Sequence, residues 1–166
     1  MTLDKFTIKA QEAVQQAVNC AQLNGQQAIE PVHLLKGVLE KAKDVTGFLF
    51  QKLGANAQQI ELLVDQDIKH LPRVEGAGQP YLSNESNQVL VKATDLSQKM
   101  GDEFVSCEPI LWALLNVNST ASRIMKDAGC TADGMQKAIN ELRKGQKVQS
   151  QSADDNYQSL EKYAKN

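Results

Sequence analysis

The 166-residue chain is poor in aromatic side chains, which make up 5% of it and include a single tryptophan. Sheets draw heavily on aromatic and β-branched residues, so this scarcity disfavours a mainly β fold. Alanine, leucine, glutamine and lysine are abundant instead, and these residues favour helices. The composition therefore predicts an all-α fold.

Long apolar runs are also missing. No run approaches the roughly 20 residues that a membrane-spanning helix needs, and the first residues lack the apolar core of a signal peptide. The three cysteines, Cys20, Cys107 and Cys130, are scattered, and no pair has metal-ligand or redox spacing. Reduced, structural thiols are the expected state. Together these features predict a cytoplasmic protein without a membrane partner.

Charge of one sign is not in excess, because the formal net charge is −2 and both halves are balanced. Proteins that bind nucleic acid usually concentrate Lys and Arg on one face, so no nucleic acid partner is expected. The chain also lacks a phosphate-binding loop, a nucleophile elbow and a paired-histidine zinc motif. His33 is predicted to be a hydrogen-bonded structural residue, and His70 a helix-end cap. We expect no catalytic residue, no cofactor and no metal in this chain.

What the chain does contain is an internal repeat. Aligned at an offset of 76 residues, apolar positions match apolar positions and glycines match glycines. Examples are Val14 with Leu90, Gly25 with Gly101, Leu39 with Leu115 and, after a one-residue deletion, Gly54 with Gly129. Such agreement indicates a tandem duplication.

Each unit is predicted to contain four helices, because its apolar residues recur at helical spacing. Thr7 is placed to cap the first helix, and Gly25 suits a left-handed stop. The expected helices are 8–24, one starting near Pro31, one ending at Gly54 and one opened by Asn56, then 84–100, 108–117, 120–128 and 132–144. Two four-helix units packed about a pseudo-twofold axis would place their equivalent first helices side by side and leave a shared groove.

The boundaries follow from composition. Repeat 1 covers about 6–70 and repeat 2 about 82–145, joined by a connector at 71–81. Prolines and glycines exclude a helix in the connector. Residues after 145 are polar and lack periodicity, so 146–166 is predicted to begin as a flexible linker. Its last part has helical character but no core, and it looks like the opening of a following domain.

Two carboxylates are candidates for a binding site. Asp102 follows the Gly101 stop, and Glu108 opens the next helix. Helix capping alone accounts for both residues. The alternative is that they flank a surface cleft and accept hydrogen bonds from a bound polypeptide, with Thr7 on its border. An apolar floor, provided by residues such as Val89 and Leu90, would suit weak recognition of exposed hydrophobic segments.

Three segments carry a resemblance to a known family. They are Ile-Glu-Pro-Val-His-Leu-Leu at 29–35, Leu-Pro-Arg-Val-Glu-Gly-Ala-Gly at 71–78 and Gly-Asp-Glu-Phe-Val-Ser-Cys-Glu at 101–108. With them, residues 1–145 resemble the Clp amino-terminal repeat domain. The connector, and Tyr-Gln-Ser-Leu-Glu-Lys-Tyr at 157–163, resemble the ClpB disaggregase type. The resemblance makes the last part of 146–166 the truncated start of a first ATPase domain.

The resemblance implies a function. The parent would be a heat-inducible, homohexameric AAA+ chaperone that uses ATP and magnesium and works with the DnaK system on unfolded or aggregated polypeptides. This domain would be its mobile substrate-engaging module, monomeric by itself and without catalysis. The residues that the family uses to engage substrate fall on Thr7, Asp102 and Glu108. Pro109 and Lys92 stand where relatives often carry aliphatic residues, which predicts a less apolar groove.

The sequence leaves two alternative functions. One is the adaptor-docking amino-terminal domain of a Clp protease ATPase of the ClpA or ClpC type. The other is a freestanding enzyme or small-molecule binder on a helical scaffold. The lack of histidine, cysteine or lysine converging with acidic residues in the sequence argues against the second.

Overall fold

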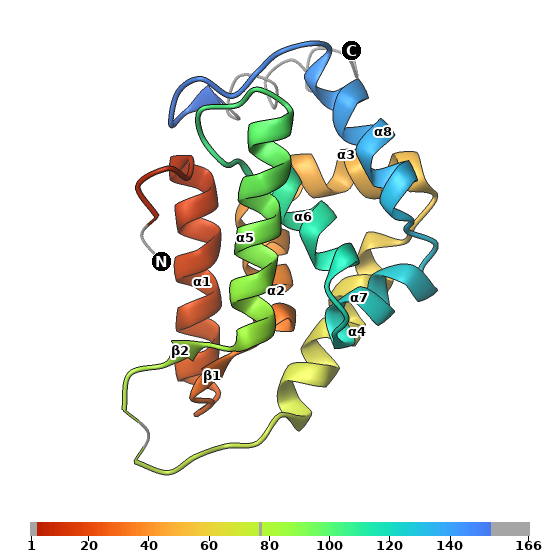
Figure 1. Ribbon diagram of the computed structural model, residues 1–166. Helices are drawn as coiled ribbons and strands as arrows, with labels where there is room; N and C mark the ends of the chain where they lie inside the picture. The colour runs from red at the N-terminus through yellow and green to blue at the C-terminus, as the bar shows by residue number, and fades with distance from the viewer. Residues whose placement is uncertain (1–2, 77, 154–166) are drawn as a thin grey trace.

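The structure is a computed structural model that describes residues 3–76 and 78–153 (Figure 1). Within these ranges the chain forms eight helices and two very short strands. They are α1 (Ile8–Leu23), β1 (Ala28–Ile29), α2 (Pro31–Lys41), α3 (Lys43–Leu53), α4 (Ala57–His70), β2 (Tyr81–Leu82), α5 (Asn84–Lys99), α6 (Cys107–Asn116), α7 (Thr120–Asp127) and α8 (Ala132–Arg143). The predicted all-α fold and four helices per repeat are confirmed. None of the helices in the described ranges combines the length and apolarity needed to cross a bilayer.

Equivalent residues start and stop the first helix of each repeat. The hydroxyl of Thr7 accepts a hydrogen bond from the amide of Ala10 at 3.1 Å. Ser83, 76 residues later, caps α5 in the same way, through the amide of Ser86 at 3.1 Å. Gly25 follows α1 with a φ of 65°, in the left-handed region where a side chain is unfavourable. The predicted cap and stop are therefore both present.

The pseudo-twofold axis is visible in two backbone pairings. Ile29 of β1 pairs in parallel with Leu82 of β2, and Phe6 forms an isolated parallel bridge with Val105. A shift of 76 residues converts Phe6 into Leu82 and Ile29 into Val105. Each repeat therefore pairs its entry segment with the segment that precedes the second helix of the other repeat. The sequence pattern does not predict these short pairings, because two residues are too few to show a period.

The first helices of the two repeats, expected to lie side by side, are not in extensive contact in the described part of the chain, and the helices that meet at the axis are α2 and α6. The extensive pairings within the repeats are α1 with α2 and α5 with α6, and between the repeats α3 packs on α8 and α4 on α7. At the centre α2 lies against α6, whereas α1 and α5 share no extensive contact among the described residues. The physical reason is apolarity. Helices α2 and α6 bury residues nearly all round, and such helices belong inside a fold.

The chain after α8 folds back onto the domain. Lys144 and Gly145 both have positive φ, 50° and 86°, and turn the backbone. The following residues, 146–151, are called the C-terminal strap below. Their single buried side chain, Val148, is 0% exposed. In the structure Val148 anchors 146–151 to the domain, and the flexible linker expected over 146–166 stays a prediction. The predicted start of an ATPase domain lies outside the described residues.

Candidate functional site

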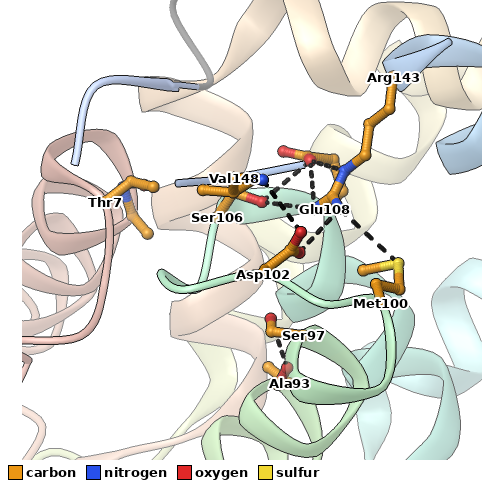
Figure 2. Close-up of polar contacts among 10 residues, drawn as sticks. Thr7, Ala93, Ser97, Met100, Asp102, Ser106, Glu108, Arg143 and Val148 are labelled. Carbon is orange, nitrogen blue, oxygen red and sulfur yellow. Dashed lines mark hydrogen bonds and ion pairs between the residues drawn. The ribbon is translucent and has the colours of Figure 1, made fainter. Parts of the chain in front are cut away.

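Arg143, in the last turn of α8, extends between the two predicted site carboxylates (Figure 2). Its Nη1 lies 2.7 Å from Oδ2 of Asp102, and its Nη2 lies 3.1 Å from Oε2 of Glu108. Nη2 also donates to the hydroxyl of Ser106 at 3.0 Å, and that hydroxyl donates to Oε2 of Glu108 at 2.9 Å. Sequence reasoning missed Arg143, since a cation in the last turn of a helix is already explained by the helix dipole.

This network is closed off from solvent. The side chains of Asp102 and Glu108 are 0% exposed, and that of Arg143 is 4% exposed. Buried charges are stable only when they are paired and hydrogen-bonded. Glu108 is therefore more than a helix-end charge, because it shares a buried cation with Asp102. Asp102 and Glu108 do lie together, as predicted, but they do not form an open rim.

The other three predicted site residues are also buried. Thr7 is 0% exposed, caps α1 through its hydroxyl, and donates its amide to the carbonyl of Val105 at 2.9 Å. Val89 and Leu90 are 0% exposed and belong to the hydrophobic core. Among residues 3–76 and 78–153, Val89 and Leu90 do not floor an accessible groove as expected, because both side chains are buried in the interior of the domain. Whether any of the five residues touches a polypeptide stays a prediction.

A segment of the chain itself covers the Asp102 end of the network. The amide of Val148 donates to Oδ1 of Asp102 at 3.0 Å. The carbonyl of Val148 accepts from the amides of Glu103 and Phe104, at 2.8 and 3.2 Å. Further along, the carbonyl of Gln151 accepts from the amide of Ile8 at 2.7 Å. The strap thus makes, with Asp102, the kind of hydrogen bond that the sequence analysis expected from a bound polypeptide.

Two surface hollows include residues named above. One of about 290 Å³ lies where the strap leaves α8 and is lined by Met100, Asn140, Arg143, Gly145, Gln146 and Lys147. A second, of about 250 Å³, includes Lys92 and Trp112 in its lining. Pro109, by contrast, is buried within α6. The expected departures from the family pattern therefore fall in different places, with Lys92 on the surface and Pro109 in the core.

The equivalent position in repeat 1 is neutral. Gln26 aligns with Asp102, and its Nε2 donates to the carbonyl of Ile68 at 2.6 Å. Nδ1 of His33 accepts from the amide of Glu30 at 2.9 Å, so Nε2 carries the hydrogen and donates to Oε1 of Gln26 at 2.7 Å. Burial lowers the pKa of His33 to about 4, which keeps the ring uncharged. The prediction of a structural, hydrogen-bonded His33 is confirmed.

Across 3–76 and 78–153, no group of three or more His, Cys, Asp or Glu side chains is placed to hold a metal ion. None of the three cysteines forms a disulfide. Burial raises the pKa of the Cys130 thiol to about 11, so this thiol is protonated and unreactive near neutral pH.

Comparison with known proteins identifies the family. Residues 5–128 match the model of the Clp repeat (R) N-terminal domain. A crystal structure of the Hsp104 N-terminal domain from Candida albicans superposes with a TM-score of 0.79 and 26% sequence identity, covering 91% of this chain and 99% of that one. The chain belongs to the Clp repeat N-terminal domain family.

Within that family the chain is similar to the N-terminal region of ClpB chaperones. It is 63% identical over 166 residues to the chaperone protein ClpB of Bacteroides thetaiotaomicron and 51% identical to that of Porphyromonas gingivalis. Each alignment covers the whole of this chain, which spans only 19% of the length of each relative. The predicted ClpB-type resemblance is confirmed, the domain is a chaperone N-terminal domain, and the ClpA or ClpC alternative is not favoured.

Proposed function

We propose that this domain engages exposed segments of unfolded or aggregated polypeptide on behalf of an ATP-dependent, ClpB-like disaggregase. The observation that carries the proposal is 63% identity along the whole chain to a chaperone of which the chain spans 19%. An ATP-driven motor then resides in other parts of the parent. The contribution of this domain is recognition.

The parent, in this proposal, is a cytoplasmic homohexameric AAA+ ATPase that uses ATP and magnesium and cooperates with the DnaK system. The supporting observation is again the likeness to ClpB chaperones. The 166 residues themselves act as a monomeric binding module without a cofactor.

The site we propose is centred on Asp102, with roles divided according to burial. Asp102 accepts a hydrogen bond from a backbone amide at Oδ1 and pairs with Arg143 through Oδ2. Oδ1 would therefore recognise the bound polypeptide, while the ion pair at Oδ2 holds the carboxylate in position. Glu108 holds the same arginine in place, and Thr7 fixes the start of α1 beside Val105. Val89 and Leu90 keep α5 seated in the core. Four of the five residues are thus proposed to position the site, while Asp102 contacts the polypeptide.

The test is to titrate the 166-residue chain with a permanently unfolded polypeptide and follow its backbone amides by NMR. We expect the largest perturbations at Ile8, Glu103 and Phe104, whose amides face the strap. The histidine network around Gln26 and His33 serves as an internal reference and should change little.

Other outcomes would redirect the proposal. Perturbations confined to surfaces remote from Asp102 would refute the site. Binding to an adaptor protein without binding to unfolded polypeptide would favour the protease-ATPase alternative. Large thermal shifts with a panel of metabolites would favour a small-molecule binder.

A further inference from the structure

The C-terminal strap is attached to the domain by very few side chains. Val148 is fully buried, while every other residue of 146–151 is exposed. The remaining contacts are mostly made by the backbone. They include the Val148 amide on Asp102, the Val148 carbonyl on Glu103 and Phe104, and the Gln151 carbonyl on Ile8. A single apolar side chain, one side-chain hydrogen bond from Nε2 of Gln151 to the carbonyl of Asp4 at 3.3 Å, and a set of main-chain hydrogen bonds therefore hold this segment.

Such contacts are not specific to the strap. Every non-proline residue carries the same backbone donor and acceptor, so any polypeptide segment can replace main-chain hydrogen bonds of this kind. The side chain of Val148 is fully buried, so the space that it fills suits a compact aliphatic side chain. Asp102 and the amides of Glu103 and Phe104 would recognise the donor and the acceptor of the residue that carries it. The arrangement is suited to unfolded chains, which expose aliphatic residues in many sequence contexts.

The turn that brings the strap back is strained. Lys144 has a φ of 50°, in the left-handed region that is unfavourable for a residue with a Cβ atom. Gly145 follows with a φ of 86°, where only glycine is free of strain. Both residues are exposed, so little packing opposes their relaxation. The closed position of the strap therefore depends on a backbone turn that favours glycine at 145.

We propose that the C-terminal strap is an intramolecular occupant of the substrate site. Incoming polypeptide displaces Val148 and inserts an aliphatic residue of its own, with its backbone amide on Asp102 and its carbonyl on Glu103 and Phe104. This inference rests on the proposed function and adds to it the feature that is recognised and the way in which access is regulated. Because a closed site lowers apparent affinity by the fraction of molecules that are open, the strap sets the threshold for binding.

The test compares the affinities of three chains for a labelled, permanently unfolded polypeptide by fluorescence anisotropy. Val148→Asp places a charge where the aliphatic side chain is buried, beside the carboxylate of Asp102, and should release the strap. Burial of a valine raises the ratio of closed to open molecules by roughly tenfold, so the variant should bind the polypeptide about tenfold more tightly than the parent chain. Val148→Ile keeps an aliphatic anchor and is the matched control, with an affinity no higher than that of the parent.

Release itself is read independently of binding. In Val148→Asp the amide of Ile8, which donates to Gln151 in the closed state, should exchange faster with solvent. A second variant, Gly145→Ala, penalises the turn without a clash, because no atom lies within 4 Å of the added Cβ. Gly145→Ala should also tighten binding. Because it leaves Val148 unchanged, it keeps the proposal testable if Val148→Asp does not fold.

A double variant separates the strap from the site. Asp102→Asn alone weakens the strap and the substrate together, so the apparent affinity should change little. In the Val148→Asp background the same change should weaken binding about tenfold, because the strap no longer competes and only the substrate then uses Oδ1 of residue 102. Equal affinities of the parent, Val148→Asp and Gly145→Ala chains would overturn the strap proposal and leave the proposed function intact. Absence of binding in all of them would overturn both.

Discussion

Gln26 in the first repeat and Asp102 in the second occupy equivalent positions, yet they belong to different chemistry. Gln26 joins a neutral network with His33 and the carbonyl of Ile68. Asp102 joins a charged one with Arg143. The chain that follows each repeat behaves differently as well. The connector leaves Val74 44% exposed, whereas the strap buries Val148 completely. We call the Gln26–His33 network the neutral seam and the Asp102–Arg143 network the charged seam. The side-chain amide and imidazole of the neutral seam bond to each other, whereas the charged seam still offers a carboxylate oxygen to a backbone amide.

The repeats also differ in how closely their first two helices approach. A Cβ atom on Gly37 of α2 would lie 2.0 Å from the carbonyl oxygen of Ala13 in α1. The equivalent of Gly37 in α6 is Ala113, and the equivalent of Ala13 in α5 is Val89. Larger side chains hold α5 and α6 further apart, and their contact is correspondingly less extensive than that of α1 with α2. The first repeat is therefore the tightly packed one, and the second carries the buried charges.

The largest expected effect is at the charged seam. Arg143→Met leaves the carboxylates of Asp102 and Glu108 buried without their cation, so the free energy of unfolding should fall by about 3–5 kcal/mol. Chemical denaturation measures this loss. Arg123→Met, on an exposed arginine, is the matched control and should change stability by less than about 0.5 kcal/mol. A loss of similar size in both variants would mean that the charged network does not stabilise the second repeat.

The next effect is a pH dependence of stability that comes from His33 in the neutral seam. The pKa of His33 is lowered by burial to about 4 from 6.5, so the unfolded chain binds a proton that the folded chain refuses between these values. Stability should therefore fall as the pH drops from 6.5 to 4, by up to about 3 kcal/mol from this residue. The position equivalent to His33 is Pro109, so the second repeat contributes no matching histidine.

The measurement is the pH dependence of unfolding for the parent chain and for His33→Gln. The variant should lose the part of the slope between pH 6.5 and 4 that belongs to His33, whatever its stability at pH 7. Identical slopes in the two proteins would assign the acid sensitivity to carboxylates instead.

The smallest of the three effects concerns helix approach. Gly37→Ala forces α1 and α2 apart and should destabilise the domain by about 1–3 kcal/mol. Gly47→Ala in α3 adds the same methyl group with no atom within 4 Å, and should stabilise it by up to about 1 kcal/mol through helix propensity. Thermal unfolding of the two variants gives opposite shifts if the comparison holds. If Gly37→Ala left thermal stability unchanged, the first repeat would tolerate an added methyl group between its first two helices, and the proposed difference in packing would be refuted.

Much of the architecture follows from local signals in the sequence. Caps such as Thr7 and stops such as Gly25 act within a few residues, so their signals are visible in the sequence. The predicted helix at 84–100 therefore agrees with α5 to within one residue. The contact of α2 with α6 at the axis could not be predicted, because periodicity shows which face of a helix is apolar but not which helices meet across an axis.

The candidate site also combines features that can be predicted from local sequence with contacts that cannot. Its carboxylates can be chosen from the sequence, but Arg143 lies 41 residues from Asp102 and 35 from Glu108. No local pattern records such a partner. The polar composition of 146–151 is typical of a linker, and the burial of Val148 depends on a pocket formed by distant segments.

The sequence by itself determined the helices, the duplication and the family, since each is written in short-range spacing or in direct similarity. The tertiary structure decided which charges are buried together and which segment covers them. Those outcomes depend on desolvation and on ion pairing between groups far apart in the chain, and these forces act only once the two repeats have packed against each other.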